Sequence, residues 1–283
     1  MYVAIDVGGT YTRVAVFSAL DITTEVDAIR FATEKKYEDQ YKKITDFISS
    51  VVGSEKITGI RISQTGSISE DKEMLVSSEF CLDFENKPLV ASLRKYFGTE
   101  NVFYENDATA AGFAELIFGK NKDVNRLAYI TISTGVGGVF IKKIQDKYEV
   151  LTTELGHMMI AGEKRMCNCG LIDCIEAYVG GHSLSKQYLS DAKDINDLRI
   201  WEKAVEYLAL AAVNLTRMCS PEALVFGGGM IENNEYIREK LQYEIKSQLR
   251  ITELPLISIS DFGDKIGVYG ALALMAVNPV AII

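Results

Sequence analysis

The chain has 283 residues, 48% of them hydrophobic, which is enough for one large or two ordinary domains with a substantial core. Its net charge of −9 and its pI near 5.0 argue against nucleic acid as a partner, because phosphate binding needs a basic face. No apolar run approaches the ~20 residues of a membrane span, and no basic segment of a secretory signal precedes the first apolar run. We therefore expect a cytoplasmic protein with neither a membrane nor a nucleic-acid partner.

Hydrophobic periodicity and turn residues predict the elements in chain order. The strands are expected at 2–7, 13–17, 56–62, 102–104, 127–132, 139–143 and 223–226. The helices are expected at 37–52, 107–118, 195–218, 235–249 and 265–277. A strand, a glycine-rich turn and a second strand occur near the start and again in the second half, which suggests an internal duplication. The sequence thus favours two α/β lobes of similar plan with a cleft between them.

Glycines directly follow the first strand in the stretch Asp6-Val7-Gly8-Gly9-Thr10. Paired glycines let backbone N–H groups approach an anion closely, and Thr10 adds a hydroxyl donor. Asp6, at the end of the strand, could hold Mg²⁺ through water. The alternative is an ordinary hairpin turn, because Gly-Gly between strands is common.

Two later stretches have the same character. Residues 131–138 read Thr-Ile-Ser-Thr-Gly-Val-Gly-Gly and form a second candidate anion-binding turn. Gly227-Gly228-Gly229 follow another strand and leave room for a flat group such as adenosine. None of the three is a Walker loop or a dinucleotide fingerprint, because neither the Gly-Lys-Ser/Thr ending nor a GxGxxG in a βαβ unit is present.

The stretch Glu105-Asn106-Asp107 lies between a predicted strand and a predicted helix. An acid and an amide at a helix start are well placed to act on a ligand. Simple N-capping by Asn106 or Asp107 is the alternative, and the two roles can coexist.

Three of the five cysteines, Cys167, Cys169 and Cys174, lie within eight residues, and His157 precedes them by ten. Three thiolates and one imidazole suit a closed tetrahedral zinc site. Disulfides are disfavoured because the odd total leaves one cysteine over. The alternative is a set of buried, reduced cysteines that pack as small apolar groups. A closed site of this kind is structural, so the chemistry is expected elsewhere.

Taken together, these motifs resemble the ROK family of sugar kinases, in the actin/Hsp70/hexokinase-like superfamily, over nearly the whole chain. The matching elements are DxGGT at 6–10, END-A at 105–108, GTG-x-GG at 133–138, ExGH at 154–157, CxCGxxGCxE at 167–176 and GGG at 227–229. The resemblance implies an α/β fold of two RNase H-like lobes. Residues 1–115, completed by a C-terminal helix at 265–283, would form one lobe, and residues 116–264, with a zinc loop at 157–176, the other.

The resemblance also implies ATP-dependent phosphorylation of a hexose, with Asp107 as the general base that takes the proton from a sugar hydroxyl. The implied sugar-binding residues are Gly66, Asn106, Asp107, Glu154, His157 and Glu176. The implied nucleotide-side residues are Asp6, Gly8, Gly9, Thr10, Thr12, Ser133, Thr134, Gly135, Gly137, Gly227, Gly228 and Gly229. His157 would bind sugar with one ring nitrogen and a structural Zn²⁺ with the other, together with Cys167, Cys169 and Cys174. The implied cofactors are ATP, Mg²⁺ and Zn²⁺, and a homodimer or larger homo-oligomer is expected.

The chain departs from the family pattern at three places. Asp173 replaces the glycine before the last cysteine, and aspartate tolerates a left-handed turn. Ser133 replaces the first glycine of GTG, and the region 65–87 lacks the usual sugar-side pattern, with Thr65-Gly66 in place of Pro-Gly. The expected acceptor is the 6-hydroxyl of glucose or a related aldohexose, with N-acetylmannosamine or fructose as the alternative. The substrate class expected as a partner is thus a hexose or N-acetylhexosamine.

Two other functional classes are open. A sugar-sensing transcriptional regulator of the same family would carry an N-terminal winged helix, which the start of this chain does not show. A sugar-binding protein without turnover would keep both lobes, but the presence of Asp6 and Asp107 favours a kinase.

Overall fold

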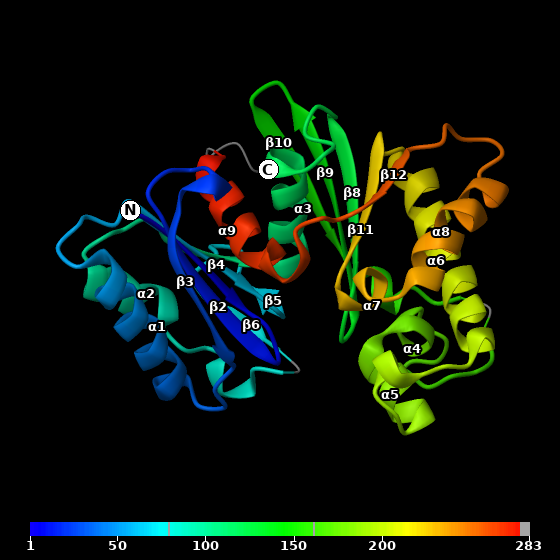
Figure 1. The fold of residues 1–283 in the computed structure, drawn as a ribbon, viewed down its shortest axis with the longest axis horizontal. Helices are drawn as coiled ribbons and strands as arrows, with labels where there is room; N and C mark the ends of the chain where they lie inside the picture. Colours follow the sequence, from blue (N-terminus) through cyan, green and yellow to red (C-terminus); the bar gives the residue numbers. More distant parts are fainter. Residues whose placement is uncertain (79, 161, 278–283) are drawn as a thin grey trace. The chain divides into compact units, whose positions relative to one another are not determined.

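A computed structural model describes residues 1–78, 80–160 and 162–277, and they form two compact units (Figure 1). Of the described residues, unit 1 contains Met1–Phe118 and 265–277, and unit 2 contains those within Gly119–Asp264. Among the described residues, no helix is both long and apolar enough to cross a membrane.

Unit 1 is built on a five-stranded sheet with the order β3-β2-β1-β4-β7. Its strands are β1 (Tyr2–Val7), β2 (Tyr11–Phe17), β3 (Glu25–Ala32), β4 (Gly59–Gln64) and β7 (Val102–Asn106). The first three run antiparallel, while β4 pairs in parallel with β1 and β7 in parallel with β4. A small hairpin of β5 (Ser67–Ile68) and β6 (Leu75–Ser77) follows β4.

Helices cover both faces of this sheet. Successive residues of β1 point to opposite faces, so they contact different helices. Val3, Ile5 and Val7 join the core shared with α1 (Tyr37–Val52) and α2 (Leu89–Phe97). Ala4 instead packs with α9 (Ile266–Ala276) on the other face. The backbones of α9 and α3 (Asp107–Phe118) approach closely, since a Cβ at Gly270 would lie 2.2 Å from the carbonyl oxygen of Ala110.

Unit 2 repeats the same plan with the order β10-β9-β8-β11-β12. Its strands are β8 (Arg126–Ile132), β9 (Val136–Ile144), β10 (Lys147–Thr153), β11 (Ala223–Gly227) and β12 (Leu256–Ile259). Again three antiparallel strands are followed by two parallel ones. The long helix α6 (Leu198–Cys219) and α8 (Glu235–Gln248) contribute to its core, and Figure 1 shows them beside this sheet.

Short helices complete the chain. The remaining α-helices are α4 (Glu176–Val179), α5 (Gly181–Tyr188) and α7 (Gly229–Glu232). The 3₁₀ helices are η1 (Ile22–Thr24), η2 (Leu82–Phe84), η3 (Leu155–His157), η4 (Ala192–Asp194) and η5 (Gly263–Lys265).

The α/β fold prediction is confirmed, and each predicted strand and helix is present with small shifts at its ends. The glycine-rich turn expected at 133–138 is shorter, because β9 already begins at Val136. The strands β3, β5, β6, β10 and β12 and the helices α2, α4, α5 and α7 were not predicted. The edge strands β3, β10 and β12 each have at most one buried residue, so they show no clear apolar alternation. The last helix, predicted at 265–277, is seen as α9; the resemblance extended it to 283, and residues 278–283 lie outside the described part.

Candidate functional site

The glycine turn between β1 and β2 exposes its backbone at the edge of unit 1. The N–H of Gly8 donates to the carbonyl oxygen of Tyr11 at 3.0 Å, which closes the turn, and Gly9 and Thr10 are exposed. A Cβ at Gly9 would lie 2.7 Å from Cβ of Phe80, so only glycine fits beneath that ring. The N–H groups of Gly9 and Thr10 are thus presented on an exposed turn, as anion binding requires.

Thr12 supports this turn from inside. It is completely buried, its Oγ1 lies 3.0 Å from Oγ1 of Thr33, and it accepts a hydrogen bond from Nε2 of Gln40 at 2.6 Å. Thr33 in turn donates to the carbonyl oxygen of Gly8 at 2.7 Å. The hydroxyl of Thr12 therefore acts on the turn through Thr33, and not by reaching the exposed edge.

Asp6 is held at the end of β1 by three elements. Ser63 on β4 donates to its Oδ1 at 3.1 Å, and Nη1 of Arg13 on β2 lies 3.6 Å from its Oδ2. The first turn of α9 packs on the carboxylate, because a Cβ at Gly267 would lie 2.2 Å from Cγ of Asp6. Mg²⁺ is commonly bound by one or two carboxylates, with water and phosphate oxygens in its other coordination positions. The oriented carboxylate of Asp6 therefore suits Mg²⁺.

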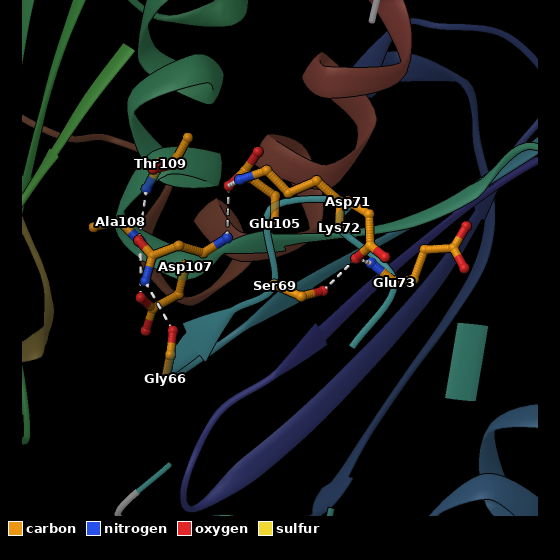
Figure 2. Close-up of polar contacts among 10 residues, drawn as sticks. Gly66, Ser69, Asp71, Lys72, Glu73, Glu105, Asp107, Ala108 and Thr109 are labelled. Atoms are coloured by element: carbon orange, nitrogen blue, oxygen red, sulfur yellow. Dashed lines mark hydrogen bonds and ion pairs between the residues drawn. The ribbon is translucent and has the colours of Figure 1, made fainter. Parts of the chain in front are cut away.

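Asn106 and Asp107 lie where β7 passes into α3. Oδ1 of Asn106 accepts from the N–H groups of Ala108 at 3.0 Å and Thr109 at 3.2 Å, so the asparagine caps the helix (Figure 2). Oδ1 of Asp107 accepts from the N–H of Ala108 at 2.8 Å. The first turn of a helix favours negative charge, so this position stabilises an ionised Asp107.

Gly66 meets Asn106 at the start of the small hairpin. Its carbonyl oxygen accepts from Nδ2 of Asn106 at 3.3 Å. Its φ of +118° and the carbonyl oxygen of Ser77, only 2.3 Å from a built Cβ, both require glycine. Three predicted sugar-side residues, Gly66, Asn106 and Asp107, are therefore brought together in unit 1.

Buried charges lie behind this group. Glu105 is 6% exposed, and its Oε1 accepts from Nζ of Lys72 at 2.9 Å. Arg61 is buried as well; desolvation lowers its pKa to about 10, and the negative charge of Glu105 opposes that shift.

In unit 2, the turn between β8 and β9 is supported by the start of α5. The N–H groups of Gly181 and His182 donate to the carbonyl oxygens of Ser133 and Thr134, both at 2.9 Å. The N–H of Ser133 donates to the carbonyl oxygen of Gly135 at 2.9 Å, and the side chains of Ser133 and Thr134 are exposed. Serine is therefore accommodated where the family pattern has glycine.

Glu176 and the ExGH segment also pack on this turn. Oε2 of Glu176 accepts from the N–H of Val136 at 2.9 Å, and a Cβ at Gly135 would lie only 2.5 Å from that oxygen. Gly156 lies against Val136, whose carbonyl oxygen would be 2.4 Å from a built Cβ. Glu154, which is exposed, and His157, which is half-buried, lie at the two ends of this segment. Through Glu176 and Gly156, the predicted nucleotide-side turn and the predicted sugar-side residues of unit 2 are neighbours.

The cysteine and histidine cluster has the dimensions of a zinc site. Four ligand atoms lie within 4.8 Å of one another, one each from His157, Cys167, Cys169 and Cys174. The sulfurs of Cys169 and Cys174 are 3.6 Å apart, and Sγ of Cys167 is 3.8 Å from Nδ1 of His157. A tetrahedron with Zn–S bonds of about 2.3 Å has edges of about 3.8 Å, so the four residues fit Zn²⁺. Nδ1 faces the thiols, which leaves Nε2 for another partner.

Gly170 and Asp173 give the zinc loop left-handed turns beside its cysteines. Gly170 has a φ of +87°, and Asp173 has a φ of +63°, as predicted for an aspartate in place of glycine. Oδ1 of Asp173 accepts from the N–H of Arg165 at 2.9 Å and from the hydroxyl of Tyr178. The loop thus keeps its shape because the aspartate adds hydrogen bonds.

Thiol chemistry in the cluster follows from burial. Desolvation raises the pKa of Cys174 to about 12 and also raises that of Cys167, whereas the N–H of Leu171 lowers the pKa of Cys169. A bound cation would favour the thiolate form of all three.

Two of the three glycines at the end of β11, Gly227 and Gly228, are required by the packing of unit 2. A Cβ at Gly227 would lie 2.2 Å from the hydroxyl oxygen of Tyr129, and one at Gly228, with a φ of +93°, would lie 2.3 Å from the carbonyl oxygen of Ile132. Only Gly229 is open, with no heavy atom closer to a built Cβ than 3.6 Å. The space expected for adenosine at Gly227 and Gly228 is therefore filled by side chain and backbone on the Cβ side.

Sequence reasoning missed two residues of unit 1. Phe80 covers Gly9, and Lys72 pairs with Glu105. Nothing in the sequence marks Lys72, because Glu70-Asp71-Lys72-Glu73 has the composition of an ordinary solvated turn.

Known proteins resemble this chain over most of its length. The sequence model of the ROK family matches residues 2–277. A glucokinase from Thermotoga maritima is 26% identical over 274 residues, which is 86% of each chain. An N-acetylmannosamine kinase from Vibrio cholerae is 26% identical over 278 residues, which is 89% of this chain and 92% of the kinase.

The fold is shared with a solved structure as well. A ROK hexokinase from Thermus thermophilus superposes with a TM-score of 0.78 at 25% identity, over 96% of this chain and 97% of the hexokinase. With a family match over nearly its whole length and the same fold as a solved ROK hexokinase, the chain belongs to the ROK family.

Proposed function

We propose that this protein transfers the γ-phosphoryl group of ATP to a hydroxyl of a hexose or N-acetylhexosamine. Membership of the ROK family, together with its kinase relatives, identifies the chain as a sugar kinase. The proposed acceptor is the 6-hydroxyl of glucose or a related sugar, with N-acetylmannosamine or fructose as the alternative.

The proposal rests on the different roles of Asn106 and Asp107. Asn106 caps α3 through Oδ1 and contacts Gly66 through Nδ2, so both ends of its amide are occupied. Asp107, at the first helical position, is the carboxylate in this group that serves as the general base. It would take the proton as the sugar oxygen attacks the γ-phosphorus, while most of the rate enhancement comes from positioning and charge neutralisation.

The glycine turns are proposed to bind the phosphates of ATP. The exposed residues Gly9 and Thr10 in unit 1 would supply backbone N–H donors of the kind that hold phosphate oxygens. In unit 2 the N–H of Ser133 is bonded to Gly135, so Thr134 and Gly135 would supply the donors there. Asp6 would hold Mg²⁺, which neutralises charge that develops on the phosphates. Thr12 supports the first turn, and Gly229 offers the open position for the nucleoside.

The zinc cluster is proposed to orient sugar-binding residues and to take no part in the chemistry. Zn²⁺ bound to Nδ1 of His157 would direct Nε2 outward as a partner for a sugar hydroxyl. Glu176, two residues after Cys174, is fixed by the same loop, and Glu154 begins the segment that carries His157. The zinc is therefore structural, but it acts close to the substrate.

We further propose that the two compact units are the two lobes of the kinase, with unit 1 completed by α9, and that the protein forms a homodimer or larger homo-oligomer. Sedimentation equilibrium tests the oligomer, and a monomer at micromolar concentration contradicts it.

The test is ADP release from Mg-ATP in a coupled assay across hexoses, N-acetylhexosamines and β-glucosides. Asp107→Asn should lose turnover by about 100- to 10,000-fold while it retains sugar binding, and Asp46→Asn, an exposed aspartate on α1, serves as the matched control. Absence of sugar-dependent release from folded, zinc-loaded protein overturns the proposal in favour of a sugar-binding protein. Full turnover in Asp107→Asn would place the general base elsewhere.

A further inference from the structure

The β5–β6 hairpin is tied to the end of β7, directly before the proposed general base. The N–H of Tyr104 donates to the carbonyl oxygen of Lys72 at 2.8 Å, and Nζ of Lys72 lies 2.9 Å from Oε1 of Glu105. At the other end of the hairpin, Nδ2 of Asn106 donates to the carbonyl oxygen of Gly66 at 3.3 Å. Figure 2 shows Lys72 reaching Glu105 from the turn while Gly66 lies beside Asp107.

A single carboxylate oxygen links this hairpin to Asn106. Oε1 of Glu105 accepts both from Nζ of Lys72 and from the N–H of Asn106, the latter at 3.0 Å. The side chain of Glu105 is 7% exposed, so its charge is poorly solvated and its orientation depends on its partners. Any movement of Lys72 is therefore felt at the backbone of Asn106, one residue before Asp107.

Lys72 has a backbone conformation that lysine adopts less readily than glycine or asparagine, because its φ of +60° lies in the left-handed region. Neighbouring side chains build the turn around it: Oδ1 of Asp71 accepts from Oγ of Ser69 at 2.6 Å and from the N–H of Glu73 at 3.1 Å. A lysine at this position is disfavoured locally, and its contact with Glu105 gives it a function.

We propose that Lys72 is a positioning residue for the sugar: its ion pair with Glu105 holds Gly66 and Asn106 in the arrangement that binds the acceptor. This inference rests on the proposed sugar kinase function. Because Lys72 acts through Glu105 and contacts neither phosphate turn, its loss should weaken sugar binding and leave the KM for ATP unchanged.

The informative variant is Lys72→Gly, because glycine accepts the left-handed backbone and removes only the side chain. Two controls separate the effects. Gln145→Gly introduces glycine at another hairpin residue, whose φ is +58°. Lys142→Ala breaks the ion pair between Lys142 and Glu149; like the Lys72–Glu105 pair, it is 2.9 Å long and its lysine side chain is 41% exposed. In Lys72→Asn, the asparagine tolerates the same backbone conformation, but its side chain is too short to reach Glu105. Lys72→Arg keeps a long cationic side chain and should keep the function of the wild type.

Steady-state kinetics, calorimetric sugar binding and thermal unfolding are measured for each variant with glucose, N-acetylmannosamine and fructose. We expect Lys72→Gly and Lys72→Asn to reduce kcat/KM for the sugar and the sugar affinity by about tenfold or more, with no comparable change in the two controls. Unchanged sugar affinity in folded Lys72→Gly or Lys72→Asn, or an equal loss in a control, overturns the positioning role. A wild-type protein that binds sugar without turnover overturns only the kinase function, since sugar affinity still tests Lys72; a wild type that binds no sugar overturns both.

Discussion

Glu176 accepts a hydrogen bond from the N–H of Val136 at 2.9 Å, and this contact joins the zinc loop to the glycine turn between β8 and β9. Glu176 follows the proposed zinc ligand Cys174 by two residues and begins α4. The loop that carries the thiols and the turn proposed to bind phosphate are therefore mechanically connected within unit 2. Disturbing either one should be felt at the other.

Gly135→Ala tests that connection. A Cβ here would lie 2.5 Å from Oε2 of Glu176, which can swing away at little cost but loses its hydrogen bond to Val136. We expect a stability loss of only about 1 kcal/mol, the value of one hydrogen bond, together with a rise in the KM for both ATP and sugar. Urea unfolding and kinetics measure the two effects. Gly229→Ala is the stability control, because its Cβ would meet nothing closer than 3.6 Å, and a larger stability loss in Gly229→Ala than in Gly135→Ala would contradict this account.

Removal of the proposed zinc should weaken sugar binding, because His157 and Glu176 are the proposed sugar-binding residues on its loop. A chelator, or Cys169→Ser, should lower the melting temperature and raise the KM for the sugar by about 10- to 100-fold, the range seen when groups around a metal are lost. Cys219→Ser, which removes a thiol outside the cluster, is the control. Zinc content is measured alongside. Purified protein that lacks zinc yet shows full activity and stability would leave the thiols as packing groups only.

Much of the fold and of the site could be predicted from sequence, because glycine-rich turns and the His/Cys spacing are local patterns. Thr12 illustrates the limit: the motif placed it beside the nucleotide, but Thr33 and Gln40, distant in sequence, enclose its hydroxyl. Lys72 shows the converse, since its partner Glu105 lies 33 residues away. Periodicity cannot reveal such pairs, because they exist only once the strands have assembled.

Glycines on α9 should separate stability from activity. Gly270→Ala would place Cβ 2.2 Å from the backbone of Ala110, which cannot move, so we expect a loss of about 3 kcal/mol or more. Gly267→Ala would instead collide with the carboxylate of Asp6, which can rotate away from Ser63 and Arg13. We expect a smaller stability loss, about 1–2 kcal/mol, but a larger rise in the KM for Mg-ATP. Urea unfolding and kinetics at varied Mg²⁺ measure both; a normal KM in Gly267→Ala would argue against Asp6 as the residue that orients Mg²⁺.

Glu232, the last residue of α7 in unit 2, should make the stability of the protein depend on pH. Burial raises the pKa of this carboxyl, although the N–H of Gly228 donates to its Oε1 at 3.2 Å and acts in the opposite direction. Because the folded pKa lies above the unfolded value, the stabilising contribution of Glu232 is full below the unfolded pKa and is lost as the pH rises through the folded pKa. Glu232→Gln keeps an acceptor for Gly228 without the charge, so it should raise the melting temperature at about pH 7 and make no difference at about pH 4, where the native carboxyl is largely protonated. Thermal unfolding across this range supplies its own control at the acidic end. A variant that is less stable than wild type at neutral pH would show that the ionised carboxylate stabilises the Gly227–Gly229 turn and that burial is not its dominant effect.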